Sequence, residues 1–104
     1  VAKMIIRFLI SDTAESQMAK AKAWYELQSP GLGAPFLQTL DETFDSIRTF
    51  PRGFPIIRGT LRQAPVKKFP YVIIYQVGRS EVRVLRVIHG RRHPIHRTGG
   101  SRKP

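Results

Sequence analysis

Residues 69–77 read Phe-Pro-Tyr-Val-Ile-Ile-Tyr-Gln-Val and decide the fold class. The strand pattern within this stretch is apolar on both faces, which is typical of a central strand covered on both sides. The next three residues, 78–80, are Gly-Arg-Ser and suit a tight turn, after which apolar residues alternate again. The sequence therefore predicts a β-hairpin with strands at 70–77 and 81–89.

Helical spacing replaces this alternation on the N-terminal side of Pro51. Apolar residues recur at helical intervals over 13–28 and again over 34–50. Residues 29–33, Ser-Pro-Gly-Leu-Gly, end the first helix because proline cannot continue it and glycine readily adopts the left-handed conformation at a helix end. Because the link is short, we expect an antiparallel helical hairpin.

Two further strands and a helix start complete the pattern. Residues 3–10 alternate as a short strand, and residues 60–65 form a weaker one in a stretch broken by proline and glycine. Asp12 and Glu15 resemble a capping box at the start of the first helix. The order β-α-α-β-β-β predicts an α+β fold, in which the helical hairpin packs on a mainly antiparallel sheet.

Length and composition limit the class of protein. The 104 residues predict one domain over 1–97 and a flexible basic tail over 98–104. Cysteine is absent, which excludes disulfides and thiol chemistry and fits a reducing compartment. No apolar run approaches the roughly 20 residues that span a bilayer. We therefore expect a soluble, cytoplasmic protein without membrane contact.

Positive charge is concentrated in the C-terminal half. Residues 1–50 carry five Lys or Arg against six Asp or Glu, whereas residues 51–104 carry thirteen against one, and the formal net charge is +11. This asymmetry favours an acidic partner, either nucleic acid or an acidic protein segment. Solubility is the competing explanation, but it would not require the whole excess in one half.

Groups suited to standard catalysis are few. Glu81 is the only carboxylate side chain after residue 50. The histidines at 89, 93 and 96 have a spacing that would hold a metal only on a helix, which Pro94 opposes. Neither of the common glycine-rich phosphate motifs occurs. We expect no metal and no cofactor.

A basic segment, His-Gly-Arg-Arg-His-Pro-Ile-His-Arg at residues 89–97, begins at the end of the last predicted strand. Such side chains hold phosphate or carboxylate through charge-assisted hydrogen bonds. The alternative is a solvated basic terminus. We predict a target-binding surface made of His89, Arg91, Arg92 and His93.

Trp24 lies about 100° around the predicted helix from Tyr25, off the centre of the core-facing stripe. It either flanks the core or belongs to a partner-facing apolar patch, with Leu27 on the same side. Exposed tryptophan often marks an interface.

Several of these stretches together resemble the RelE/ParE superfamily of bacterial toxins. The resemblance rests on Trp-Tyr-Glu at 24–26, Gly-Leu-Gly at 31–33, the strand at 69–75 and the His-Gly-Arg-Arg-His-Pro run at 89–94. It covers roughly residues 3–97 and is greatest for the ParE, or plasmid-stabilisation, branch. The resemblance implies the small α+β fold and a toxin neutralised by a cognate antitoxin.

The two branches of the superfamily imply different activities. ParE-like members inhibit DNA gyrase and lack an evident nuclease site, whereas RelE-like members are ribosome-dependent endoribonucleases that cut mRNA. The nuclease counterparts here would be Arg62 and Arg92, with His93 or His96 as the general acid–base. All three tyrosines precede the last strand, so the resemblance favours gyrase inhibition without catalysis. A nucleic-acid-binding module without toxicity is a third, weaker alternative.

A basic toxin that must be held inactive requires an acidic partner. We expect a ParD-like or similar antitoxin that is partly disordered and folds as it wraps the domain. Trp24 and Leu27 are the predicted apolar anchors, while the basic half accelerates association.

Overall fold

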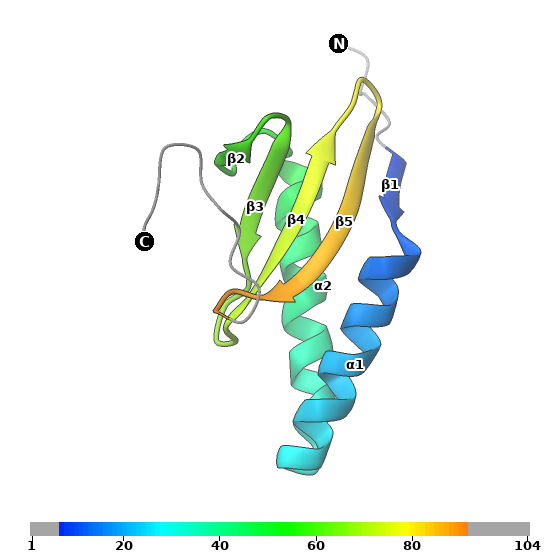
Figure 1. Ribbon diagram of the computed structural model, residues 1–104, viewed down its shortest axis with the longest axis vertical. Coiled ribbons are helices and arrows are strands. Elements are labelled where there is room, and N and C mark those ends of the chain that lie inside the picture. Colours follow the sequence, from blue (N-terminus) through cyan, green and yellow to red (C-terminus); the bar gives the residue numbers. More distant parts are fainter. Residues whose placement is uncertain (1–6, 92–104) are drawn as a thin grey trace.

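The computed structural model describes residues 7–91, so the prediction for residues 3–6, the tail at 98–104 and the side chains of Arg92, His93 and His96 lie outside the described residues. Two helices and five strands follow one another along the chain (Figure 1). They are β1 (Arg7–Ile10), α1 (Asp12–Gln28), α2 (Gly33–Thr49), β2 (Ile56–Arg58), β3 (Leu61–Pro65), β4 (Tyr71–Val77) and β5 (Glu81–His89).

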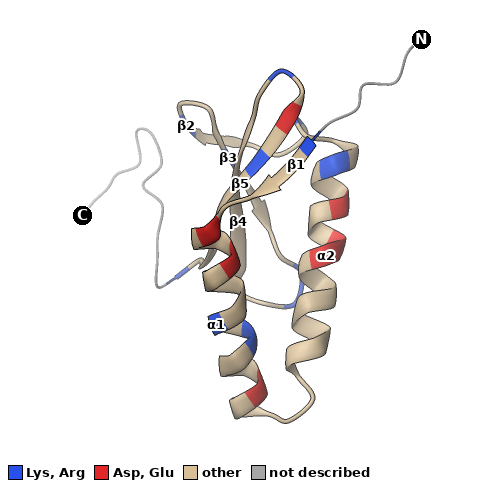
Figure 2. Cartoon of the chain, turned by 90° about the vertical axis from the view of Figure 1, so that its right-hand side faces the viewer, with Lys and Arg blue, Asp and Glu red and all other residues tan. Residues whose placement is uncertain are grey.

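The five strands form one sheet in the order β1-β5-β4-β3-β2. β1 runs parallel to β5, and the other neighbours are antiparallel. The helices lie side by side as an antiparallel hairpin over one face of the sheet (Figures 1 and 2). The predicted α+β fold with a mainly antiparallel sheet is confirmed. No helix within residues 7–91 is both long and apolar enough to cross a membrane.

The strand β2 was not predicted. It has three residues and pairs with β3 through Ile56 opposite Arg62 and Arg58 opposite Leu61. Gly59, with a φ of 55°, makes the turn between the two strands possible. β2 is too short to show an alternating pattern, and proline and glycine precede it in the sequence. The sequence therefore did not indicate this strand.

Helix α1 begins one residue earlier than the capping-box prediction implied. Ser11 is the N-cap residue, and its hydroxyl accepts a hydrogen bond from the backbone N–H of Ala14 at 3.0 Å. The prediction of Asp12 at the N-cap was therefore wrong. Ser11 has an extended backbone conformation, which is typical of an N-cap residue, whereas Asp12 is already part of the helix. Asp12 and Glu15 are in the first turn, where carboxylates interact favourably with the helix dipole.

Side chains of α1 and of its N-cap residue attach that helix to the edge of β5 beyond the end of β1. The Ser11 hydroxyl donates to the carbonyl of Leu85 at 2.9 Å, and the Gln17 side-chain oxygen accepts from the N–H of Val87 at 2.8 Å. β5 carries a bulge at Leu85, since Tyr75 pairs with Val84 but Ile74 pairs with Arg86. The start of α1 thus provides hydrogen-bond partners for backbone groups on the part of the β5 edge that does not pair with β1.

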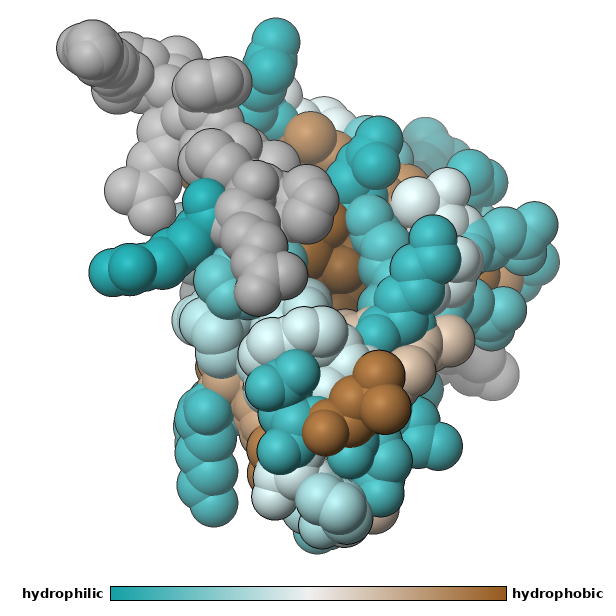
Figure 3. All heavy atoms as spheres, turned by 60° about the horizontal axis from the view of Figure 1, so that its bottom comes forward, coloured by the Kyte–Doolittle hydropathy of each residue, from teal (hydrophilic) through white to brown (hydrophobic). Residues whose placement is uncertain are grey.

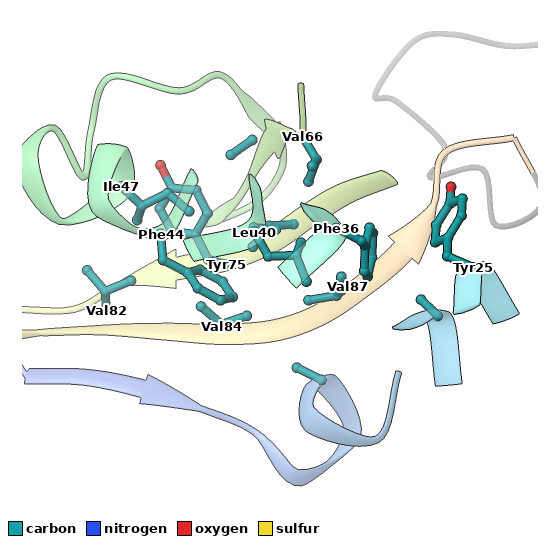
Figure 4. Close-up of a cluster of buried hydrophobic side chains, with 14 residues drawn as sticks. Tyr25, Phe36, Leu40, Phe44, Ile47, Val66, Tyr75, Val82, Val84 and Val87 are labelled. Carbon is teal, nitrogen blue, oxygen red and sulfur yellow. The ribbon is translucent and has the colours of Figure 1, made fainter. Parts of the chain in front are cut away.

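The main core lies between α2 and the sheet (Figure 4). The predicted stripe of α2 is fully buried and faces valines of β5; it consists of Phe36, Leu40, Phe44 and Ile47. α1 contributes mostly small side chains, Ala14 and Ala21, together with Tyr25 near its C-terminal end. Small residues let α1 approach β5 closely, which brings the end of this helix beside the end of that strand.

The central strand β4 is buried on both faces, as the sequence predicted. Ile73 and Tyr75 belong to the core beneath the helices. Ile74, on the opposite face, packs with Ile57 and Ile88 in a second, smaller cluster. The continuous apolar run of β4 is explained by these two clusters.

Candidate partner-binding surface

A carboxylate fixes the turn between the two helices. Glu26 accepts hydrogen bonds from the N–H groups of Gly31 at 2.8 Å and Gly33 at 2.9 Å. Both bonds lower the pKa of the Glu26 carboxyl below its ordinary value, and the bond from Gly31 has the larger effect. Gly31 has a φ of 92°, and a Cβ on Gly33 would lie 2.9 Å from a carboxylate oxygen of Glu26. Glu26 and the two glycines therefore hold the turn between the helices in one conformation.

Trp24 and Leu27 lie in the part of α1 that this turn holds in place. Trp24 is 42% exposed and its indole packs edge-on against Tyr25, with ring centroids 5.0 Å apart. Leu27 is 83% exposed. Figure 3 views this end of the molecule, where hydrophobic groups stand among hydrophilic ones. Trp24 thus flanks the core and also reaches the surface, while the assignment of both residues to an antitoxin interface stays a prediction.

Aromatic rings connect this part of α1 to the end of β5. Tyr25 contacts the rings of Phe36 and Phe69 at 4.9 Å and that of Tyr71 at 6.1 Å. Tyr71 in turn packs edge-on against His89, with centroids 5.4 Å apart. The last residue of β5 is thereby held against the same aromatic cluster as the last turns of α1.

The first residues of the basic segment have a defined geometry. His89 pairs with Tyr71 across β4 and β5, and the N–H of Gly90 donates to the carbonyl of Pro70 at 2.8 Å. The N–H of Arg91 donates to Nδ1 of His89 at 3.1 Å, while the Arg91 side chain is exposed. Of the four residues predicted to bind a target, the structure places His89 and Arg91 next to each other.

A hollow of about 390 Å³ lies between α1 and the C-terminal end of β5. We call it the α1–β5 hollow. Its lining residues come from three elements and are Gln17, Lys20, Ala21, Trp24, Tyr71, Val87, Ile88 and His89. Trp24 and His89, which the sequence assigned to two different surfaces, therefore share one hollow. Sequence reasoning missed Gln17, Lys20 and Tyr71, although Lys20 and Trp24 are four residues apart and so share a helix face.

Arg62, one of the nuclease candidates, binds a loop. Its guanidinium donates to the backbone carbonyls of Arg52 at 3.2 Å and Phe54 at 2.7 Å. These contacts give Arg62 a structural part in holding the loop that precedes β2. Its catalytic role stays a prediction, since Arg92 and His93 lie outside the described residues.

The described charges are distributed over both layers. All acidic positions except Glu81 lie on the helices, which also carry Lys20, Lys22 and Arg48, and further basic positions mark β1, the β4–β5 turn and the loop before β4 (Figure 2). Between residues 7 and 91, no group of three or more His, Asp or Glu side chains is arranged to hold a metal ion.

A solved structure has the same fold as this small α+β domain. That structure, of the chromosomal ParDE TA system from P. aeruginosa, is similar to this chain with a TM-score of 0.75 at 14% sequence identity. The similarity covers 84% of this chain and 98% of that chain. No curated protein sequence matches the chain.

Residues 8–94 match the family described as "ParE toxin of type II toxin-antitoxin system, parDE". This match spans most of the 104 residues, and the chain therefore belongs to the ParE toxin family. The resemblance to the RelE/ParE superfamily, and to its ParE branch in particular, is confirmed.

Proposed function

We propose that this ParE-family toxin acts on DNA gyrase through protein contacts and breaks no bond itself. The family match over residues 8–94 carries the proposal. Two further observations support it: the Arg62 guanidinium is bound to loop carbonyls, and the Tyr75 hydroxyl donates to the carbonyl of Pro51 at 2.7 Å. Arg62, a nuclease candidate, and Tyr75, one of the three tyrosines, are thus both engaged in structural contacts. Acting on gyrase requires a cytoplasmic location.

The proposed target-binding surface is the basic segment at the end of β5, with His89, Arg91, Arg92 and His93. His89 is held by Tyr71 and by its bond from Arg91, so the segment leaves the sheet from a fixed position. Arginine keeps its charge at physiological pH and binds carboxylate or phosphate bidentately. Acidic groups of a gyrase–DNA complex suit such a surface.

The proposed regulator is a cognate acidic antitoxin, because the solved relative is a ParDE system and this chain is strongly basic. Trp24 and Leu27 are its apolar anchors, since both are exposed next to an ordered turn. The basic half of the chain increases the association rate, and the apolar anchors lengthen the lifetime of the complex.

Two assays on the purified protein test the target. Supercoiling by purified gyrase should stop, with cleaved DNA accumulating, while mRNA on translating ribosomes stays intact. Unaffected gyrase together with codon-linked mRNA cuts would instead establish the ribosome-dependent nuclease, for which Arg62, Arg92 and His93 are the candidate residues. If neither assay responds while nucleic acid binds, the protein is a binding module without these toxic activities.

A further inference from the structure

The α1–β5 hollow has the size and lining of a ligand site. Its volume of about 390 Å³ falls within the range of small-molecule pockets. Gln17, Lys20 and Trp24 follow one another at helical spacing along α1, so an amide, an ammonium group and an indole face the end of β5. Gln17 is held in place by its bond to Val87. This wall of the hollow is therefore ordered by the fold.

Aromatic and apolar groups make up most of the lining, which also includes one cation. The rings of Trp24, Tyr71 and His89 line it together with Val87. Lys20 belongs to the lining, and the exposed side chain of Arg91 begins two residues after His89. A ligand that fits this combination has a flat unsaturated group for the rings and negative charge close to that group.

We propose that the α1–β5 hollow binds single-stranded nucleic acid, with one unstacked base against Trp24 and the flanking phosphates at Lys20 and Arg91. Stacking on an aromatic side chain is available to every base, so binding is tolerant of sequence. An acidic peptide would satisfy the cations, but its carboxylates offer no ring face to the indole. The site is independent of which enzyme or particle the toxin attacks.

The position of Trp24 gives this site a consequence for regulation. An antitoxin anchored on Trp24 covers the hollow, and nucleic acid and antitoxin then compete for it. The purified toxin–antitoxin complex therefore binds the same oligonucleotide far more weakly than the toxin does.

Trp24 is the only tryptophan of the chain, so its fluorescence reports on the hollow directly. A short oligothymidylate is titrated into the full-length protein at low salt. We expect saturable quenching of the emission and an affinity that falls as salt is added. Absence of saturable quenching at low salt overturns the proposal, as does quenching by an acidic peptide but not by the oligonucleotide.

Two lysines of α1 provide a matched pair of variants. Lys20→Gln removes a charge inside the hollow and should weaken binding several-fold. The slope of affinity against salt concentration should fall by the amount expected for about one lost phosphate contact. Lys22→Gln removes the same charge from the same helix outside the hollow and should change little. Equal losses in the two variants would reduce the binding to non-specific attraction by a basic protein and overturn the proposal.

A third variant, Trp24→Leu, tests the stacking itself with a fluorescently labelled oligonucleotide. Loss of one stacked base should weaken binding about 5- to 150-fold, and wild-type affinity in a folded Trp24→Leu protein overturns the proposal. The gyrase assay is read separately. Quenching without gyrase inhibition would support the nucleic-acid site and contradict gyrase as the target. Gyrase inhibition without quenching would support gyrase as the target and contradict the nucleic-acid site.

Discussion

Arg62 and Tyr75 lie directly opposite each other across β3 and β4, and both side chains bind the backbone of the same loop. Arg62 holds the carbonyls of Arg52 and Phe54, while the Tyr75 hydroxyl holds the carbonyl of Pro51. The loop between α2 and β2 contains two prolines and a glycine and makes few backbone bonds of its own. One cross-strand pair therefore fixes the segment that joins the helical layer to the sheet.

Removing the Arg62 guanidinium should destabilise this connection. Arg62→Met keeps an unbranched apolar stem but loses the bonds to two carbonyls, and we expect a loss of about 1.5–3 kcal/mol in the free energy of unfolding. Urea titration measures the loss. The matched control is Arg58→Met in the neighbouring strand β2, where an exposed side chain should cost less than about 0.5 kcal/mol. Equal effects in the two variants would contradict the structural role of Arg62.

Tyr75 should make stability fall at high pH. Burial raises the pKa of its hydroxyl above the ordinary value of about 10, and the cation of Arg62 opposes this shift. The folded state thus holds the proton more tightly than the unfolded state. The contribution is complete below about pH 10 and is lost as the pH rises through the folded pKa. The free energy of unfolding, followed from about pH 8 to about pH 11, should fall more steeply for the wild type than for Tyr75→Phe.

Glu26 produces the opposite dependence at low pH. Bonds from Gly31 and Gly33 lower the pKa of its carboxyl, so the folded state favours the charged form. Its contribution is present above the ordinary pKa of 4.5 and disappears as the pH falls through the folded pKa. The melting temperature of Glu26→Gln should therefore decline less between neutral and acid pH than that of the wild type. Parallel curves for the two proteins would show that the carboxylate does not stabilise the turn.

Much of this architecture could be predicted from periodicity, because long buried elements impose their period on the sequence. The strand predicted at 81–89 coincides with β5, and the predicted helices differ from α1 and α2 by one residue at each changed end. β2 could not be found, because three residues carry no period. The N-cap was assigned one residue late, because Ser11 and Asp12 are both good capping residues and only the end of β1 distinguishes them.

The candidate site could be predicted only as separate residues. Trp24 was identifiable from its position off the helical stripe, and His89 from its place at the end of a strand. Their meeting in one hollow depends on Ala14 and Ala21, which let α1 approach β5, and on the bond from Val87 to Gln17. Contacts between residues so distant in the chain leave no periodic signal.

The anchor role of Trp24 predicts a large loss of antitoxin affinity on truncation. Trp24→Ala should weaken binding of the cognate antitoxin about 30-fold or more, as expected for a buried tryptophan anchor. Isothermal titration calorimetry measures the affinity, with Thr13→Ala at the other, exposed end of α1 as the control. An affinity within about a factor of two of the wild type would place Trp24 outside the interface.

The basic segment should be needed for toxicity and not for folding. Arg91 is exposed, and its contact with His89 is made by the backbone N–H, which alanine retains. The double change Arg91→Ala/Arg92→Ala should therefore leave the melting temperature nearly unchanged, within the roughly 0.5 kcal/mol of surface substitutions, while abolishing gyrase inhibition and growth arrest.

The control for that double change removes the same charge elsewhere. Arg58→Ala/Arg79→Ala takes two exposed arginines from β2 and from the β4–β5 turn and should leave toxicity intact. Because both double variants have the same net charge, a difference between them reports the position of the arginines and not the overall field of the protein. A toxic Arg91→Ala/Arg92→Ala protein, or one that loses toxicity only by unfolding, would show that the segment after β5 is not the surface that meets the target.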